Sequence, residues 1–449
     1  MADKLAIAVV HYHLRPGGVT RVVERAVESL GDRVELLVFS GEAPAPDDAL
    51  TPICEPFHAL AYSDENNLPD MEQVIEDMRF TAQALFGREP DIWHIHNHSL
   101  GKNDFTPLLV WHLAKAGCRL LLQPHDFAED GRPENYRLLK DQLGSGLNDM
   151  LYPLAQHVWY APINYRDKAF LEGIGLKQVH ELPNSVTAHE QRAAGSTSAK
   201  TILYPARAIR RKNLGELLLW SLLAPEGYTF QSTLAPQNPK WQGYYNEWVA
   251  FAEELGLPVE FDAGRKHDFA DLVRNADALI STSIAEGFGL AFLEPWLEGK
   301  MLVGRKLPEI TTDFEKEGLD LSSLYATLPV PLEWAGVELF METLTSAMQE
   351  SYASYSKTWK PEYVEQANAA LVVDGKVDFG ILDEQLQRNV IRHLVEHPAD
   401  RALLPALETE ANGDLIEHNR RVVQECYSKE SYGDRLLGIY RDLAATSPG

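Results

Sequence analysis

Short apolar runs alternate with longer amphipathic stretches through residues 1–300. Nearly continuous apolar runs separated by helix-length stretches are typical of parallel strands that are covered by helices on both faces. The first series of predicted strands comprises Leu5–Val10, Val34–Phe39, Ile92–His96, Arg119–Gln123, His157–Ala161 and Val179–Leu182. The second series comprises Thr201–Tyr204, Thr229–Leu234, Val259–Phe261 and Ala278–Ser281.

A small-residue stretch separates the two series. Residues 187–200 contain Ala-Ala-Gly-Ser-Thr-Ser-Ala, a composition typical of a linker. We therefore predict an α/β fold with two Rossmann-like domains, residues 1–186 and 201–430, which face each other across a cleft. Ligands of such sheets bind at the carboxyl ends of the strands.

The pattern changes beyond residue 331. Helical periodicity dominates, as in Gly336–Tyr355 and Asp383–Glu396, and strand-like runs are rare. We predict that residues 331–430 form a helical extension of the second domain. The amphipathic stretch Ser431–Arg441 predicts a terminal helix within residues 431–449.

The composition is that of an ordinary globular protein. A chain of 449 residues exceeds what one core usually supports, which agrees with two domains. The apolar share is 45%, and no apolar run reaches the length of about 18 residues that a membrane span needs. The N-terminal stretch leads directly into the first predicted strand and lacks the pattern of a signal peptide, so we expect a cytoplasmic location.

Charge and cysteines exclude several other classes. A formal net charge of −25 argues against nucleic acid as a partner and, more weakly, against association with anionic membranes. Cys54, Cys118 and Cys426 lie far apart without Cys-x-x-Cys spacing, which favours free thiols over a disulfide framework or a zinc knuckle. The sequence does not determine the oligomeric state.

The segment Ile280–Glu294 carries the strongest signal for a ligand, because it reads as a strand, a glycine-rich turn and a helix start. Glycines let the backbone approach a ligand, and the first N–H groups of a helix suit phosphate. Carboxylates at both ends of the turn suit hydroxyl groups of a sugar and of a ribose. The alternative is an ordinary turn with solvated carboxylates. The candidates for a sugar-nucleotide site are Glu286, Gly287, Phe288, Gly289, Leu290, Ala291 and Glu294.

A basic run follows the first strand of the second series. An arginine and a lysine placed by a strand end can stabilise the negative charge that grows on a departing diphosphate. Arg207 and Lys212 are the first candidates for this role, and Arg211 is the reserve. A solvated basic loop is the competing interpretation.

Histidines gather after two strands of the first domain. His94, His96 and His98 alternate, and His125-Asp126 follows the next strand. Three histidines on one face of a strand can bind zinc, but we expect the strand to end near His96 and the loop to Lys102 to line the acceptor side of the cleft. The alternative for a histidine at a strand end is a structural role.

The pattern Glu286-x7-Glu294 around Gly-Phe-Gly-Leu resembles the donor site of retaining glycosyltransferases of the GT-B fold, in particular family GT4. The resemblance implies that Glu286 contacts the transferred sugar and Glu294 the ribose. Arg207 and Lys212 match the Arg-to-Lys spacing of that family's Gly-Arg-x4-Lys-Gly motif, although Ala206 and Asn213 replace both glycines.

Further matches extend the resemblance over residues 5–310 and the terminal helix. The Gly17-Gly18 turn corresponds to the family's glycine pair at the donor diphosphate, whereas the three-glycine fingerprint of nicotinamide dehydrogenases is missing. His125 corresponds to the histidine beside the transferred sugar, and Arg265 falls where such enzymes hold the base. The family's mechanism uses no protein nucleophile, and the missing Asp-x-Asp triplet agrees with its metal independence.

These observations predict a retaining hexosyltransferase with no cofactor and no metal, whose co-substrate is a nucleotide sugar, with UDP-glucose as the first donor to test. A small polar acceptor with a carboxylate or phosphate would suit the basic and histidine side chains of the first domain. The predicted acceptor-binding residues are Arg15, His96, His98, Lys102 and Asp126. The alternatives are a glycosyl phosphorylase, a nucleotide-sugar epimerase or a catalytically silent sugar-nucleotide-binding protein.

Overall fold

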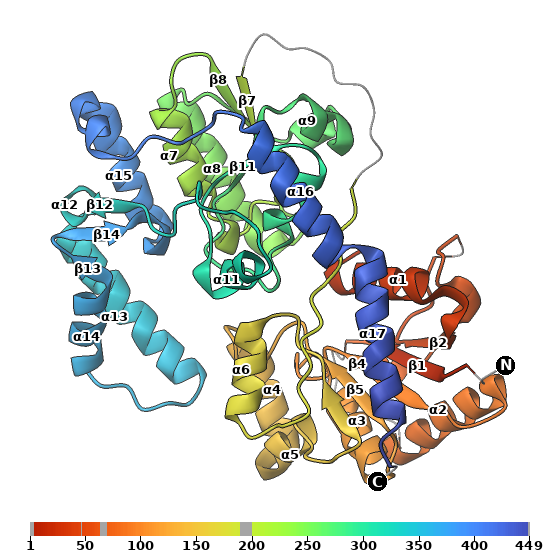
Figure 1. The fold of residues 1–449 in the computed structure, drawn as a ribbon. Coiled ribbons are helices and arrows are strands. Elements are labelled where there is room, and N and C mark those ends of the chain that lie inside the picture. Colours follow the sequence, from red (N-terminus) through yellow and green to blue (C-terminus); the bar gives the residue numbers. More distant parts are fainter. Residues whose placement is uncertain (1–3, 46, 63–69, 189–199, 448–449) are drawn as a thin grey trace. The chain divides into compact units, whose positions relative to one another are not determined.

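The chain forms two compact units in a computed structural model, which describes residues 4–45, 47–62, 70–188 and 200–447 (Figure 1). Unit 1 comprises Met1–Ser185 and Tyr427–Gly449, and unit 2 comprises Val186–Cys426. The chain therefore leaves unit 1, builds all of unit 2 and returns. Most of the predicted linker, residues 189–199, lies outside the described residues.

Unit 1 is built on a six-stranded sheet with the order β3-β2-β1-β4-β5-β6. All of its neighbouring strands are parallel, as the apolar runs predict. The strands are β1 (Ala6–His11), β2 (Glu35–Ser40), β3 (Cys54–Pro56), β4 (Ile92–His96), β5 (Leu120–Gln123) and β6 (Val158–Tyr160).

The predicted strand Val179–Leu182 does not form a ladder. It runs beside β6 and makes one isolated bridge, between Tyr160 and Val179. The Leu182 N–H donates to the Pro162 carbonyl at 2.8 Å, but proline has no N–H with which to continue the ladder. A short apolar run can therefore lie along a sheet edge without becoming a strand.

Alternate residues of the unit 1 strands enter two separate cores. Ala8 and Val10 pack toward α2 (Met71–Phe86) and α3 (Phe105–Lys115). Ile7 and Val9 pack on the other face, toward α1 (Gly18–Leu30) and the terminal helix α17 (Lys429–Ala444). Since both faces are covered, each strand is apolar at nearly every position. The remaining helices of unit 1 are α4 (Pro133–Leu143), α5 (Leu147–Leu151) and α6 (Tyr165–Gly173).

The terminal helix completes the core of unit 1. Its apolar face packs into the same cluster as α1, through Tyr432, Leu436, Leu437, Tyr440 and Leu443. Gly433 lies where the two helices approach most closely, since a Cβ atom there would come within 2.8 Å of the Ser29 Cβ. In Figure 1 α17 lies beside α1 and the central strands of its unit.

Unit 2 contains a five-stranded parallel sheet with the order β11-β10-β7-β8-β9. Its strands are β7 (Lys200–Tyr204), β8 (Tyr228–Ser232), β9 (Val259–Glu260), β10 (Ala278–Ser281) and β11 (Met301–Gly304). The helices up to residue 316 are α7 (Leu214–Leu223), α8 (Gln242–Leu255), α9 (Phe269–Asn275), α10 (Glu294–Leu297) and α11 (Pro308–Lys316). The helix α7 is apolar around nearly its whole circumference, which is typical of a helix enclosed on all sides.

The predicted helical extension is only partly helical. It contains a three-stranded antiparallel sheet with the order β12-β14-β13, formed by Pro329–Pro331, Lys376–Asp378 and Val372–Val373. Asp374 and Gly375, both with positive φ, make the turn between the last two strands, as an Asp-Gly pair favours. The helices from residue 332 to 427 are α12 (Leu332–Ala335), α13 (Val337–Ser354), α14 (Glu362–Leu371), α15 (Glu384–Glu396) and α16 (Gly413–Tyr427).

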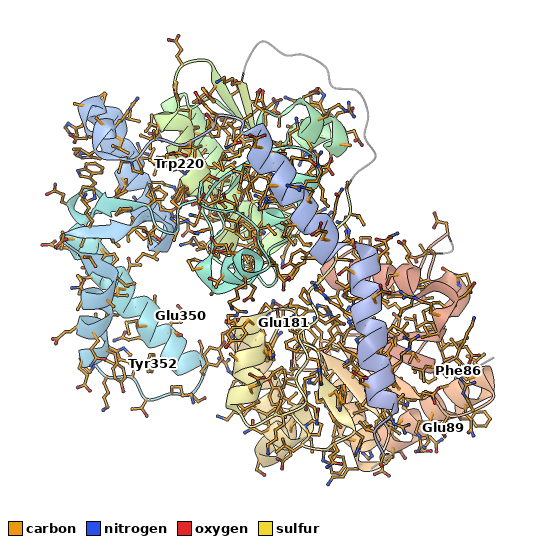
Figure 2. The ribbon with its side chains drawn as sticks, in the orientation of Figure 1. Phe86, Glu89, Glu181, Trp220, Glu350 and Tyr352 are labelled. Atoms are coloured by element: carbon orange, nitrogen blue, oxygen red, sulfur yellow. The ribbon has the colours of Figure 1, made fainter. Side chains whose placement is uncertain are left out.

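The extension closes one side of unit 2. The helix α15 packs against α7, and Tyr352 on α13, labelled in Figure 2, stacks on Tyr363 of α14 at 5.3 Å between ring centroids. Across the described ranges, no helix combines the length and the apolar character that crossing a membrane requires.

Candidate functional site

Both large sheets have a point where the strand order reverses. In unit 2 the chain continues from β7 to β8 on one side of this point and from β10 to β11 on the other. In unit 1 it continues from β1 to β2 on one side and from β4 to β5 on the other. A crevice opens at the carboxyl ends of strands at such points, and open α/β sheets bind their ligands there. The predicted site residues lie at or after the carboxyl ends of these four strands and of β5, except Arg265, which follows β9.

The unit 2 site centres on Glu286. The Lys212 ammonium binds Glu286 Oε1, and an Arg211 Nη1 atom lies 3.6 Å from Glu286 Oε2. The side chains of Glu286 and Lys212 are 8% and 17% exposed, whereas Arg211 is 50% exposed. Water therefore screens the Lys212 contact less than the Arg211 contact.

The carbonyl of Lys212 is held by two hydroxyl groups from the central strands. The Tyr204 hydroxyl donates to it at 2.7 Å, and the Thr282 hydroxyl donates at 2.9 Å. The Ile284 N–H donates to the Arg211 carbonyl at 2.8 Å, which joins the basic run to the loop that carries Glu286. The ion pair thus rests on buried strand ends and backbone hydrogen bonds.

The glycine turn differs from its prediction in the element that follows it. Gly289 has a φ of +91°, and a Cβ atom there would lie 2.8 Å from the Phe292 ring, so the turn requires glycine. A 3-10 turn, Leu290–Phe292, follows, and α10 is only four residues long. The predicted helix start directly after the glycines is therefore a 3-10 turn, and the α-helix begins only at Glu294. Leu293 (φ −114°) separates α10 from the turn, and Pro295 lies in the first turn of α10.

This correction changes how a phosphate could bind at the turn. The first internal hydrogen bond of the 3-10 turn joins the Phe292 N–H to the Gly289 carbonyl, so the N–H groups of Leu290 and Ala291 precede it. Local N–H groups remain as donors, but a four-residue helix has only a small dipole. Gly287 and Phe288 lie in the same turn, and Glu294 is the first residue of α10.

Arg207 and Arg265 lie on other loops of unit 2. Arg207 is exposed and donates to Gln237, which follows β8. Arg265 is 68% exposed, and its Nε atom lies 3.4 Å from the Asp262 carboxylate after β9. Lys212 and Arg211 therefore share the Glu286 site, whereas the other two predicted basic residues have partners elsewhere.

Four histidines cluster at the carboxyl ends of β1, β4 and β5 in unit 1. His96 Nδ1 lies 3.0 Å from His125 Nε2, and the two rings stack at 5.3 Å between centroids. The His94 ring lies tilted against the His96 ring at 4.3 Å between centroids, and the His11 ring meets the His96 ring edge-on at 6.1 Å. The parallel register that pairs His96 with Gln123 places His125 beside it.

The histidine cluster is neutral. Burial lowers the pKa of His94 to about 4, and burial together with the neighbouring imidazoles lowers the pKa of His11 and His125 to about 3. Burial and the same neighbours also hold the pKa of His96 well below its usual range. Packed imidazoles in such surroundings act as hydrogen-bonding groups, not as cations.

His125 is fixed in one orientation by its neighbours. Asn97, which has a φ of +56°, accepts from the His125 N–H at 2.7 Å and from the Asp126 N–H at 3.0 Å. The side chain of His125 contacts His96 through Nε2, so Nδ1 is the ring atom that another group can address. Sequence reasoning missed Asn97. Its place between two histidines at a strand end was the available signal.

The other predicted acceptor-binding residues divide into two groups. His98 is completely buried, and its Nε2 atom lies 2.9 Å from the Leu151 carbonyl, surroundings typical of a core histidine. Lys102 lies over the Tyr62 ring at 5.5 Å from its centroid. Asp126 binds Arg132 at 2.7 Å, and Arg15 pairs with Glu42.

Tyr62 and Arg132 were not predicted, and they extend the group that contains Arg15, Lys102 and Asp126. The Tyr62 ring also packs edge-on against His13, with 5.0 Å between centroids. Burial raises the pKa of Tyr62. The charge of Asp126 raises this pKa as well, whereas the charges of Arg132 and Arg15 lower it. An aromatic ring among several cations therefore lies at the carboxyl end of the unit 1 sheet.

Gly17 and Gly18 start α1, as predicted for a strand-to-helix turn. Gly17 is the N-cap with extended backbone (φ −171°), and α1 begins at Gly18. The Thr20 hydroxyl donates to the Arg15 carbonyl at 2.7 Å and closes this turn. These glycines belong to unit 1, whereas the other predicted donor-binding residues belong to unit 2.

In the part of the chain that the structure describes, no three His, Cys, Asp or Glu side chains are arranged to hold a metal ion.

Comparison with solved structures establishes the architecture. The chain resembles Anabaena HepE in complex with UDP, with a TM-score of 0.57 and 13% identity, over 98% of this chain and 100% of that one. A glycosyltransferase from Rickettsia africae gives a TM-score of 0.57 and 12% identity, over 99% of this chain and 100% of that one. The chain has the GT-B fold.

Sequence comparison adds a relative of higher identity over part of the chain. A mannosylglucosyl-3-phosphoglycerate synthase from Petrotoga mobilis is 27% identical over 340 residues, which cover 68% of this chain. The match spans 66% of that synthase, slightly less than two thirds of its length. No protein-family model matches the chain. In this GT-B chain, each unit thus has its own candidate cluster after its central strands.

Proposed function

We propose that this protein is a retaining glycosyltransferase of the GT4 type, which moves a hexosyl group from a nucleotide sugar to a hydroxyl group of a small polar acceptor. The ion pair of Lys212 with Glu286 at the switch point of unit 2 carries the proposal. A cation and a carboxylate on adjacent rigid loops suit the two ends of a sugar diphosphate, since the phosphates need positive charge and the sugar needs hydrogen-bond acceptors.

In the proposed reaction, the donor diphosphate takes over the Lys212 ammonium from Glu286. Arg211 supplies a second, more exposed cation. The N–H groups at the start of the 3-10 turn can donate to the same phosphates. Glu286 is then free to accept hydrogen bonds from sugar hydroxyls. As the bond between the anomeric carbon and the phosphate oxygen breaks, charge grows on the phosphate, where Lys212 stabilises it.

The acceptor hydroxyl then attacks the anomeric carbon on the face that the phosphate leaves, and its proton passes to the departing phosphate oxygen. No protein nucleophile takes part. His125, neutral and fixed by His96 and Asn97, offers its Nδ1 atom to a hydroxyl of the transferred sugar. Lys212 and Arg211 neutralise the phosphate charge themselves, so we expect transfer that does not depend on a divalent metal.

The relatives guide the choice of substrates. HepE structures hold UDP and UDP-glucose, which supports UDP-glucose as the first donor. The Petrotoga synthase is named for a mannosylated product that contains a phosphoglycerate, which supports a mannosyl donor such as GDP-mannose as the second. An anionic acceptor agrees with the cations Arg15, Lys102 and Arg132 around Tyr62 in unit 1.

The first experiment is a thermal-shift screen of the purified protein against UDP, GDP, ADP and their common sugar conjugates, with and without a chelator. A ligand that binds only the folded protein raises its melting temperature by mass action. Stabilisation by one nucleotide family in the wild type, and its loss in Lys212→Met, would support the donor site. Stabilisation that persists in Lys212→Met would overturn the assignment of that residue.

Transfer is then assayed with the stabilising donor and phosphorylated or carboxylated acceptors, glucosyl-3-phosphoglycerate among them. NMR of the product reports the anomeric configuration. Retention agrees with the proposal, and inversion contradicts it. Phosphate-dependent turnover would instead identify a phosphorylase, interconversion of the free nucleotide sugar would identify an epimerase, and binding without turnover would identify a silent binding protein.

A further inference from the structure

The loop that carries Lys212 is joined to a distant part of the chain. Lys212 is followed by Asn213, whose side chain is completely buried. The Asn213 amide accepts from Gln387 Nε2 at 2.8 Å and donates to the Glu216 carboxylate at 2.8 Å. Gln387 lies on α15, in the extension beyond residue 331, and it is only 1% exposed.

A buried ion network makes a second connection. Arg305, directly after β11, donates to Glu216 at 2.7 Å and to Asp378 of β14 at 2.8 Å. The side chains of Glu216 and Arg305 are 0% and 3% exposed. The neighbouring carboxylates of Glu216 and Asp378 keep the pKa of Arg305 above its usual value although burial acts in the opposite direction.

Two aromatic side chains complete this network through hydrogen bonds. The Tyr325 hydroxyl donates to Glu216 at 2.6 Å, and the indole N–H of Trp220 donates to the Tyr325 hydroxyl at 2.6 Å. Trp220 lies on α7, the helix that begins directly after Asn213 (Figure 2). Both oxygens of Glu216 are thus hydrogen-bonded, by Asn213, Arg305 and Tyr325, and a buried network of this kind holds one arrangement.

The backbone at Asn213 explains why its side chain matters. Asn213 has a φ of +52°, a left-handed conformation that glycine and asparagine adopt most readily. Glycine at this position would allow the same turn but would remove one hydrogen bond from Gln387, which also donates to the Phe379 carbonyl, and one from Glu216. The asparagine therefore combines the required backbone with two fixed hydrogen bonds.

We infer that Gln387 and Asp378 of the extension are positioning residues, which hold Asn213 and thereby place the Lys212 ammonium for the donor diphosphate. The inference rests on the proposed function and gives the extension a part in it. A cation that must meet a phosphate within a few tenths of an ångström needs a supporting shell of fixed side chains. The first sheet of unit 2 does not supply this shell alone, because Gln387 and Asp378 come from the segment after it.

The test compares diphosphate with monophosphate binding, because only the diphosphate extends to Lys212. Calorimetry on the full-length protein would measure UDP against UMP, GDP against GMP and ADP against AMP. Gln387→Met keeps the volume and removes the hydrogen bond, and Asn213→Gly keeps the turn and removes both contacts. The diphosphate preference is the ratio of the affinity for the diphosphate to the affinity for the matching monophosphate. We expect this ratio to fall about tenfold in each variant, with little change in monophosphate affinity.

A matched control comes from the same helix. Asn389 on α15 donates to the Ala335 carbonyl at 2.8 Å, a contact that stays within the extension. Asn389→Ala should therefore lower thermal stability but leave the diphosphate preference unchanged. The double variant Asn213→Gly/Gln387→Met should be no weaker in diphosphate binding than the weaker single variant, since both remove one shared hydrogen bond.

Two outcomes would overturn the inference. If wild type prefers the diphosphate and both Gln387→Met and Asn213→Gly keep that preference, the extension has no positioning role, while the proposed function stands. If wild type binds no nucleotide diphosphate, the proposed function fails and the inference fails with it. Should Gln387→Met not fold, the comparison of Asn213→Gly with Asn389→Ala decides the matter.

Discussion

The two candidate clusters of this protein use opposite chemistry. The unit 2 cluster is ionic, with Lys212 and Arg211 on Glu286. In the unit 1 cluster, by contrast, His11, His94, His96 and His125 are buried and uncharged. Both lie at the carboxyl ends of central parallel strands, so the fold does not explain the difference.

Under the proposed function, the contrast shows how one architecture can serve two ends of a reaction. A polyanionic leaving group requires fixed positive charge, and unit 2 places it on loops anchored in a buried network. A sugar hydroxyl requires donors and acceptors that do not change their charge with pH, and a packed histidine cluster supplies them. Perturbing the two clusters separately should therefore give different kinetic signatures.

The largest effect is expected from Lys212→Met. Removal of the cation that stabilises the leaving phosphate should reduce transfer by about 10²–10³-fold and weaken diphosphate binding. Enzyme kinetics and calorimetry measure the two losses. Arg392→Ala, which removes an exposed ion pair with Glu254 on the same unit, is the control and should change neither. Full activity in Lys212→Met would remove the ionic side of the comparison.

A smaller effect is expected from His125→Asn. The variant should slow transfer by about 10–10²-fold but leave donor affinity within about twofold of wild type, because the imidazole addresses the sugar and not the phosphates. Single-turnover kinetics would separate the two quantities. His418→Asn, an exposed histidine bonded to the Gly318 carbonyl, is the matched control. A loss confined to donor affinity would contradict the role of His125.

Acid should destabilise unit 1 through its histidines. The folded pKa values of His94 and His125 are about 4 and about 3, below the unfolded value, so the unfolded chain takes up protons first as pH falls. The contribution of these neutral histidines to the free energy of unfolding is complete above about pH 6.5 and is lost as the pH falls toward about pH 3–4. At pH 5 the loss in the free energy of unfolding amounts to ~2 kcal/mol per histidine. Hydrogen exchange of the β4 and β5 amides at pH 7 and pH 5 measures this change.

The matched variant for the acid experiment is His94→Gln, which removes one titrating group from the cluster. Its β4 and β5 amides should lose less protection between pH 7 and pH 5 than those of the wild type. Equal losses in both proteins would show that other groups cause the acid sensitivity.

The smallest effect is expected from Arg211→Ala. The guanidinium is half exposed and 3.6 Å from Glu286, and an exposed ion pair of this kind contributes up to about 1 kcal/mol. Donor affinity should therefore fall by at most about fivefold, far less than in Lys212→Met. Equal losses in the two variants would contradict the weaker role that the exposure of Arg211 predicts.

Much of the fold follows from local pattern. The apolar runs predicted Ile92–His96 and Ala278–Ser281 with their observed bounds, because strands buried on both faces leave a strong signal. The small sheet of the extension was missed although Asp374-Gly375 is a strong hairpin signal, since its flanking strands have only two and three residues. Such short strands carry too little periodicity to detect.

The sequence by itself determined the parallel α/β units, the glycine turn at Gly289 and the residue types of the two candidate clusters, because these depend on periodicity, backbone conformation and charge. Tertiary structure alone decided which cation meets Glu286, that His96 holds His125, and that Gln387 reaches Asn213. These pairs are 74, 29 and 174 residues apart. Strand order, register and helix packing bring them together, and no local pattern records those relations.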